Sequence, residues 1–169
     1  MCSHSGVTEP AAAPGPTPPG QTSPGQTRTV ENRLEFPYTR TVGPVIGGFL
    51  AGLREQRLLG ARSRTGRVLV PPLEYDPDTG DPVDPDLVEV GPQGTVTTWT
   101  WVAEPKPKHP LDRPFAVALI RPDGADTALV HAVDAGTPEA MHTGMVVTPR
   151  WRGEPTGLVT DIEAWEPRR

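Results

Sequence analysis

The sequence is poor in the residues that build disulfide-linked and membrane-spanning proteins. It contains a single cysteine in 169 residues, Cys2, so no disulfide can form within the chain. No apolar run approaches the roughly 20 residues that a membrane-spanning helix requires. The N-terminal residues MCSHSGVTEP also lack the basic and apolar regions of a signal peptide. These absences predict a protein of the reducing cytoplasm with no membrane contact.

Positive charge is scarce as well. The formal net charge is −5, which argues against a surface that binds nucleic acid through bulk positive charge. The 23 prolines and 18 glycines exclude a helical bundle and favour a β protein with many turns.

Residues 1–27 consist mainly of Pro, Gly, Thr, Ser, Gln and Ala. Such a segment has little apolar surface to bury, so it is predicted to be a disordered tail. Leu34, Phe36 and Tyr38 then alternate in the sequence. They predict an extended arm that packs either on its own domain or on a partner.

One amphipathic helix is predicted, from Pro44 to Arg57. Proline suits the first helical position, where its missing N–H costs nothing. The apolar residues that recur at helical spacing are Val45, Ile46, Phe49, Leu50 and Leu53. Two interpretations of this stripe stay open: it packs on the sheet of its own chain, or it docks on a partner subunit. We assign residues 28–60 to the arm and this helix.

Two short turns that end in glycine, RSRTG (62–66) and DPDTG (76–80), are joined by an extended apolar segment. This is the frame of a zinc ribbon, in which each turn carries two cysteines. The four ligand places fall on Arg62, Thr65, Asp76 and Thr79. None of these side chains is a thiolate or an imidazole, and a guanidinium repels a metal cation. We therefore expect a metal-free ribbon over residues 61–86, with an ion pair between Arg62 and Asp76 in place of the zinc.

Five strand candidates follow, with turn residues between them. They are GTVTTWTWV (94–102), FAVALIR (115–121), TALVHAV (127–133), MVVTPRW (145–151) and LVTDIEAW (158–165). A short helix is predicted over residues 137–143, with Thr137 as its N-cap. Five strands with a helix between the third and the fourth outline an OB-fold barrel, which we assign to residues 87–169.

The order of helix, ribbon and five-stranded barrel resembles the zinc-ribbon/OB-fold family called domain of unknown function thirty-five. The resemblance covers roughly residues 36–166. Its most specific parts are G-x-V-x-x-P-P at residues 66–72 and PFAVAL followed by DGAD within residues 114–126. It implies a mainly β fold, in which an amphipathic helix and a degenerate, rubredoxin-like ribbon precede the OB-fold barrel.

Members of this family accompany thiolase-like enzymes in acyl-CoA metabolism. The resemblance therefore implies a non-catalytic accessory subunit that docks on a thiolase or retro-aldolase and helps to form or shield its substrate path. The ribbon without cysteines looks like that of actinobacterial relatives, which points to steroid or lipid side-chain degradation. The residues expected to contact the partner are Phe36, Tyr38, Ile46, Phe49, Leu50 and Leu53. No cofactor is expected, apart from acyl-CoA as a ligand shared with the partner.

Candidates for contact with acyl-CoA lie in the proline-rich loop EPKPKHPLDRP (104–114) and on the first barrel strand. The loop gathers basic side chains that suit the phosphates of coenzyme A: Lys106, Lys108, His109 and Arg113. Trp99 and Trp101 share one side of the strand and are expected near the ligand path. In a nucleic-acid OB-fold such aromatic residues would stack on bases.

No catalytic constellation is recognisable in residues 28–169. The sequence contains no G-x-S-x-G, HExxH or Walker-type motif, and no cysteine nucleophile in this part. His131 alternates with Leu129 and Val133, so we expect a half-buried core histidine rather than a base. The chain is thus predicted not to be an enzyme itself. The alternative function is a stand-alone OB-fold protein that binds acyl-CoA or single-stranded nucleic acid.

Overall fold

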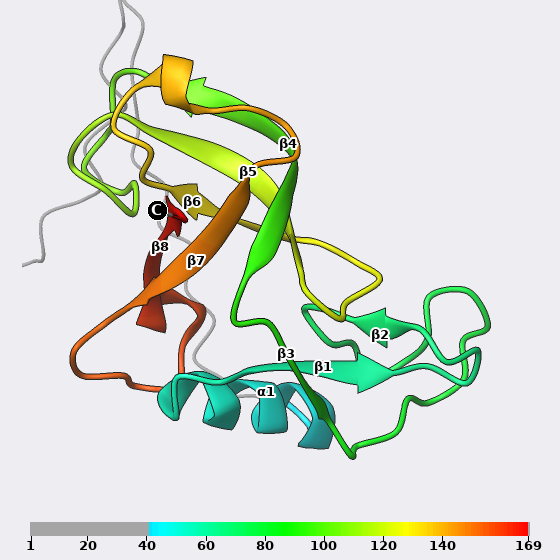
Figure 1. Cartoon of the computed structure of the whole chain (residues 1–169). Helices are drawn as coiled ribbons and strands as arrows, with labels where there is room; N and C mark the ends of the chain where they lie inside the picture. The colour runs from blue at the N-terminus through cyan, green and yellow to red at the C-terminus, as the bar shows by residue number, and fades with distance from the viewer. Residues whose placement is uncertain (1–40, 169) are drawn as a thin grey trace, which may run out of the picture. The chain divides into compact units, whose positions relative to one another are not determined.

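The computed structural model describes residues 41–168, which form a helix, a three-stranded sheet and a closed five-stranded barrel (Figure 1). In chain order the elements are α1 (Pro44–Arg54), β1 (Leu58–Arg62), β2 (Val68–Leu69), β3 (Val88–Val90), β4 (Gly94–Val102), β5 (Phe115–Pro122), β6 (Leu129–Val133), the 3-10 turn η1 (Pro138–Ala140), β7 (Val146–Trp151), the 3-10 turn η2 (Val159–Asp161) and β8 (Ile162–Pro167). The predicted arm residues Phe36 and Tyr38 lie outside the described residues.

The predicted helix is present, but it ends at Arg54 rather than at Arg57. The chain turns back there because Gln56 adopts a φ of 57°, and the N–H of Arg57 donates to the carbonyl of Gly52 at 2.8 Å. At the other end the carboxylate of Glu74 accepts the N–H of Ile46 at 3.1 Å. This bond satisfies one of the backbone donors that a helix leaves free in its first turn.

The predicted ribbon and the residues on either side of it form a small sheet in the order β2-β1-β3, with β1 antiparallel to both neighbours. Its two turns close on glycines, as predicted: Gly66 has a φ of 86° and Gly80 a φ of 73°. A residue with a Cβ atom is strained in this left-handed conformation.

The expected ion pair between Arg62 and Asp76 is wrong. Arg62 donates instead to the carbonyl of Gly66 at 3.3 Å, and Asp76 is buried with Oδ1 accepting the N–H of Asp78 at 2.8 Å. The carboxylate of Asp76 thus accepts a hydrogen bond within its own turn, residues 76–80, instead of pairing with Arg62. Other side chains link the two turns, in the pairs Arg64–Asp81 and Arg67–Asp78.

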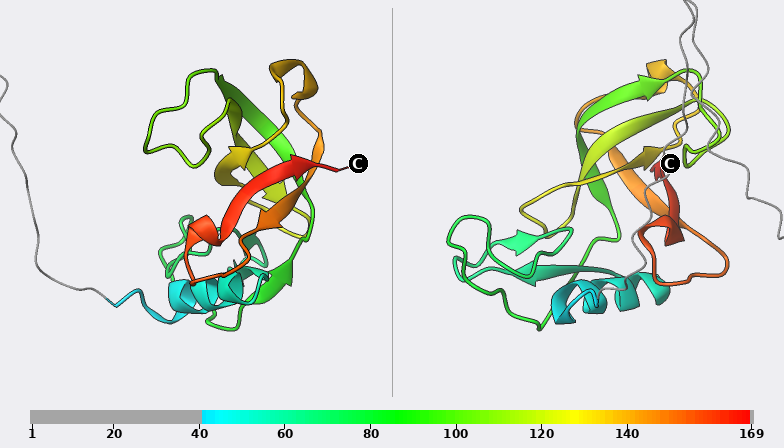
Figure 2. Two further views of the ribbon diagram at one scale, coloured as in Figure 1. Left: turned by 90° about the vertical axis from the view of Figure 1, so that its left-hand side faces the viewer. Right: turned by 180° about the vertical axis from the view of Figure 1, so that it is seen from behind.

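The barrel closes in the order β4-β5-β6-β8-β7. All of its pairings are antiparallel except the one between β6 and β8, which are parallel and pair only at Val133 and Trp165. The mainly β fold with an OB-fold barrel is therefore confirmed. Figure 2 shows the connection between β4 and β5 projecting from the barrel, as the proline content of residues 104–114 predicts.

The barrel strands follow the predicted ranges closely except at the last one. Residues 158–165 were expected as a strand, but β8 begins only at Ile162 because η2 precedes it. The buried carboxylate of Asp161 accepts the backbone N–H groups of Thr156, Gly157 and Leu158, at 2.9, 2.6 and 3.0 Å, and so holds this segment in a tight turn. 

The predicted short helix at residues 137–143 is also smaller than expected. It is reduced to the single 3-10 turn η1. Thr137 precedes this turn as predicted, but its side chain forms no capping hydrogen bond. 

The two segments that carry the family resemblance contact each other. The side-chain carboxylate of Asp126 accepts the N–H of Val68 at 2.7 Å, and the N–H of Asp126 donates to the carbonyl of Val68 at 2.8 Å. The hydroxyl of Thr127 accepts from the N–H of Val70 at 2.7 Å and lies 2.9 Å from its carbonyl. The β5–β6 connection therefore binds the backbone N–H and carbonyl groups of Val68 and Val70, as a neighbouring strand would. These hydrogen bonds join the ribbon to the barrel.

One hydrophobic core extends across the helix, the ribbon and the barrel. Phe49 and Leu53 of α1, with 6% and 0% of their surface exposed, belong to the same cluster as Val70 of the ribbon and Ile120 and Trp165 of the barrel. The stripe of α1 thus packs mainly on its own chain, which is one of the two interpretations left open by the sequence. The expectation that Phe49 and Leu53 contact a partner is corrected, because their side chains are already covered.

Candidate functional site

A cavity of about 720 Å³ lies beside the barrel, between the β4–β5 loop and the strands β5, β6, β7 and β8. Side chains alternate between the two faces of a strand, so Ala116 and Val133 point into the barrel core while Phe115 and Ala132 point away from it. Phe115 and Ala132 form a separate apolar cluster with Leu111 of the loop. The parts of the cavity wall formed by Phe115 and Ala132 therefore belong to the outer surface of the barrel, whereas Ile162 of the wall belongs to the core cluster.

The parallel pairing of β6 with β8 leaves room for this cavity. The two strands pair only at Val133 and Trp165, so the earlier part of β6 is not joined to β8. His131 lies at this part of β6 and lines the cavity, and across it stand Val159 and Thr160 of η2.

The β4–β5 loop covers one side of the cavity. The ring of His109 lies edge-on to the ring of Phe115, with centroids 5.8 Å apart, and its Nδ1 accepts the N–H of Lys106 at 3.2 Å. Leu111 of the loop is 9% exposed and packs against the barrel. These contacts fix the loop so that its basic side chains stand at the rim of the cavity.

A network of ion pairs borders the cavity at the ends of β6, β7 and β8. Arg113 and Arg150 both contact the carboxylate of Asp134, whose side chain is 11% exposed, and Nη1 of Arg150 lies 3.0 Å from it. Arg150 also binds Glu163 at 3.2 Å, and it contacts Glu166. Burial would raise the pKa of the Asp134 carboxyl, but the hydrogen bonds from both arginines outweigh it and lower the pKa.

His131 is half-buried, as the sequence predicts, although it lies in the wall of the cavity rather than in the packed core. Burial lowers the pKa of its imidazole, which keeps the ring neutral. Nε2 lies 3.5 Å from the carbonyl of Val159, a long separation for a hydrogen bond. Nδ1 is buried and has no hydrogen-bond partner among the described residues.

The structure brings some of the predicted ligand-binding residues to the cavity and leaves others away from it. Lys106, His109 and Arg113 line the cavity, whereas Lys108 does not. Trp99 and Trp101 are half-buried and pack against the barrel core. The two tryptophans pair across the strands with Ala118 and Ala116, which face the barrel interior. The predicted set therefore does not form one site.

Sequence reasoning missed Arg150, Arg152 and Thr160, which line the same cavity. They lie in β7, just after it and in η2, far along the chain from the basic loop. No motif marks them, because only the closure of the barrel brings β7 and η2 next to residues 104–114.

Within residues 41–168, no three His, Cys, Asp or Glu side chains gather where they could hold a metal ion. In the same part of the chain, no helix has the length and apolar character needed to cross a membrane. The absence of zinc from the ribbon stays a prediction, which elemental analysis of the purified protein tests. One zinc per chain would contradict it.

Three comparisons with known proteins bear on this fold. Residues 87–152 match the family model described as "ChsH2, C-terminal OB-fold domain". A chain of the solved structure described as "Ltp2-ChsH2(DUF35) aldolase" superposes with a TM-score of 0.57 at 21% identity, covering 76% of this chain and 98% of that one. A DUF35-family protein of unknown function from Sulfolobus solfataricus gives a TM-score of 0.58 at 19% identity, covering 75% of this chain and 85% of that one. No curated protein matches the chain.

The two structural likenesses show a common fold. The coverage of about three quarters of this chain is more than the barrel residues 94–167 alone can supply, so the likeness extends beyond the barrel.

Proposed function

We propose that the chain is a non-catalytic accessory subunit of an aldolase or another thiolase-like enzyme, because its residues 87–152 match the family model described as the ChsH2 C-terminal OB-fold domain. The observation that carries this proposal is the match itself, together with the common fold of the chain in the structure described as an Ltp2-ChsH2(DUF35) aldolase. That description joins a DUF35 protein with an aldolase.

The surroundings of the histidines support a non-catalytic role. Within the described residues, each side-chain hydrogen bond of a histidine involves the backbone: His109 with Lys106, His131 with Val159 and His142 with Thr143. A nucleophile activated by histidine needs a direct hydrogen bond between the two side chains.

We infer that the partner docks on a surface formed by α1 and η2. Ile46 and Leu50 remain partly exposed on α1, and Leu158, just before η2, and Val159 of η2 expose 54% and 49% of their surface. Arg54 of α1 donates to the carbonyl of Thr156 at 3.0 Å, which joins the two elements. A partly exposed apolar surface of this kind is typical of protein–protein contacts. Phe36 and Tyr38, which lie outside the described residues, stay predicted partner contacts.

The substrate class follows from the same proposal. The cavity lies beside this surface, since Val159 belongs to both. The accessory subunit would then shield the substrate path of its partner, with an acyl-CoA of steroid or lipid side-chain degradation as the substrate. Lys106 supplies positive charge near that path, and His109 and Arg113 also line the cavity.

Copurification tests the docking proposal. The tagged chain is coexpressed with a candidate thiolase-like enzyme from the same organism, and the complex is measured by size-exclusion chromatography and by the affinity of the purified subunits. Leu158→Glu is expected to weaken binding by tenfold or more, because a charge placed in a buried interface must be desolvated. Leu73→Glu is the matched control, since Leu73 is also an exposed leucine, at 45%, and lies in the ribbon.

The outcomes of this experiment test the α1–η2 docking surface and the accessory role separately. Equal binding of the two variants would contradict the α1–η2 surface, and the absence of any complex would contradict the accessory role. Turnover of an acyl-CoA by the chain alone would contradict the non-catalytic role.

A second candidate is a stand-alone binding protein for acyl-CoA. It is favoured by one observation, that the cavity is built from this chain alone. A nucleic-acid ligand is not favoured, because Trp99 and Trp101 pack against the barrel core instead of presenting a stacking surface.

A further inference from the structure

The cavity beside β6 has an apolar body. Phe115 and Val117 of β5 form part of its wall, together with Val130 of β6 and Val159 of η2. Val130 and Val159 expose 63% and 49% of their surface, so this wall is apolar and still open to solvent. A volume of about 720 Å³ falls within the roughly 300–1,000 Å³ of small-molecule sites. The cavity can therefore cover an apolar chain or ring system.

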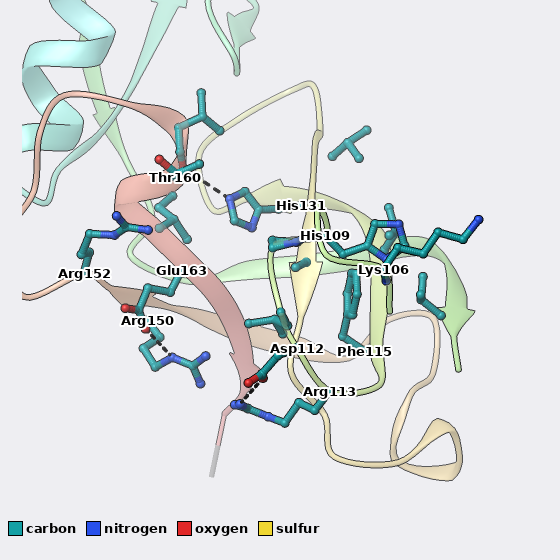
Figure 3. Close-up of a pocket in the computed structure, with 18 of the residues that line it drawn as sticks. Lys106, His109, Asp112, Arg113, Phe115, His131, Arg150, Arg152, Thr160 and Glu163 are labelled. Carbon is teal, nitrogen blue, oxygen red and sulfur yellow. Dashed lines mark hydrogen bonds and ion pairs between the residues drawn. The ribbon is translucent and has the colours of Figure 1, made fainter. Parts of the chain in front are cut away.

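One end of the cavity is polar. Figure 3 shows Arg152, Thr160 and His131 toward one side of the cavity, and Lys106 toward the other. The backbone N–H of Arg152 donates to the carbonyl of Asp161 at 2.7 Å, which fixes the position of Arg152 beside η2. Its guanidinium forms no ion pair with any residue of the described part of the chain.

The other arginines around the cavity are already neutralised. Arg113 contacts Asp134, and Arg150 contacts Asp134, Glu163 and Glu166. Within residues 41–168, the guanidinium of Arg152 is thus the one at the polar end that has no ion pair. The planar fork of an arginine matches the two oxygens of one carboxylate. Several phosphates, as in coenzyme A, would need more uncommitted cations than this end provides.

From this arrangement we propose that the cavity is a binding site for a free carboxylate with an apolar chain. Arg152 binds the carboxylate, and the hydroxyl of Thr160 is the second donor at this end. The apolar chain lies along Val117 and Val130. This site goes beyond the proposed accessory role and does not depend on it, because every residue involved belongs to this chain.

Titration calorimetry of the full chain with decanoate tests the site. Arg152→Gln is expected to weaken decanoate binding about tenfold, the usual effect of losing a charge-assisted hydrogen bond. Arg121→Gln is the matched control, because Arg121 is exposed on β5 and does not line the cavity. It should change the affinity by less than about twofold. Equal losses in both variants would show that only the overall charge matters and would overturn the site.

The apolar wall is tested in the same way. Val130→Glu places a charge in the wall at an exposed position and should weaken decanoate binding at least about tenfold, whereas Val146→Glu, at a valine 39% exposed outside the cavity, should not. Circular dichroism checks that both variants are folded. Unchanged binding by Val130→Glu would overturn the proposal.

Two further ligands test the chemistry of the head group. Decanol, which has the same chain without the charge, should bind more weakly than decanoate to the wild type. The affinity for decanol should change little in the Arg152→Gln variant. No binding of decanoate, or binding of decanoyl-CoA alone, would overturn the assignment of the site to a free carboxylate. Neither result bears on copurification with an enzyme, so the site and the accessory role fail or hold separately.

Discussion

The substitution Phe49→Ala distinguishes a core role of α1 from a docking role. The sequence presents Phe49 as one residue of an apolar stripe that is equally suited to a partner. In the structure its ring is 6% exposed and belongs to the core that α1 shares with the barrel residues Ile120 and Trp165. Removing the ring should therefore destabilise the whole fold rather than a surface contact.

The magnitude follows from the burial of the ring. Truncation of a buried phenylalanine to alanine costs about 3–5 kcal/mol, because the transfer free energy is lost and a cavity remains. This is a large part of the roughly 5–15 kcal/mol by which a domain is usually stable. With a urea m-value of about 2 kcal/mol/M, the unfolding midpoint should fall by about 1.5–2.5 M.

Urea unfolding followed by circular dichroism measures this change. Ile46→Ala is the control on the same helix: Ile46 is only half-buried, so its loss should cost about 1 kcal/mol or less. If Phe49→Ala lost less than about 1 kcal/mol while binding of a partner was abolished, the core assignment of α1 would be refuted. Copurification with Phe49→Ala is informative only after this measurement, because an unfolded chain also fails to bind.

Three other substitutions test the electrostatics. The pKa of His131 is lowered from 6.5 by burial, so the unfolded chain binds a proton first and stability is lost as the pH falls below 6.5. His131→Gln should flatten this loss in urea titrations, and an unchanged loss would contradict the assignment. Hydrogen bonds from backbone N–H groups hold the pKa of Asp161 below 3.8 in spite of its burial, so its contribution to stability is present above that pH and is lost as the pH falls through the folded pKa. Asp161→Asn should therefore lower the thermal midpoint at neutral pH, and the variant should lose less stability on acidification than the wild type. An unchanged midpoint at neutral pH would contradict this. Arg67→Gln removes the exposed pair with Asp78 and should cost no more than about 1 kcal/mol, so a larger loss would mean that the pair holds the ribbon together.

The candidate site was only partly predictable from the sequence. The loop cations Lys106 and Arg113 are close together along the chain, so their clustering is visible without a structure. Arg152 and Thr160 meet them only because β7 and η2 close the barrel beside the loop. The orientation of Trp99 also depends on a register shift between Val96 and Thr98, which a pattern of alternating residues does not reveal.

The sequence by itself determined the local structure of this protein. Proline at the start of α1, glycine at the turns of the ribbon and the spacing of apolar residues in the strands are short-range signals, and a few neighbouring residues decide each of them. The tertiary structure alone decided which surfaces are used. Asp126 and Thr127 join the ribbon to the barrel through Val68 and Val70, more than fifty residues away along the chain. That pairing, and the burial of Phe49 with it, depends on closing long loops, and no local pattern records which of the available apolar and polar surfaces will meet.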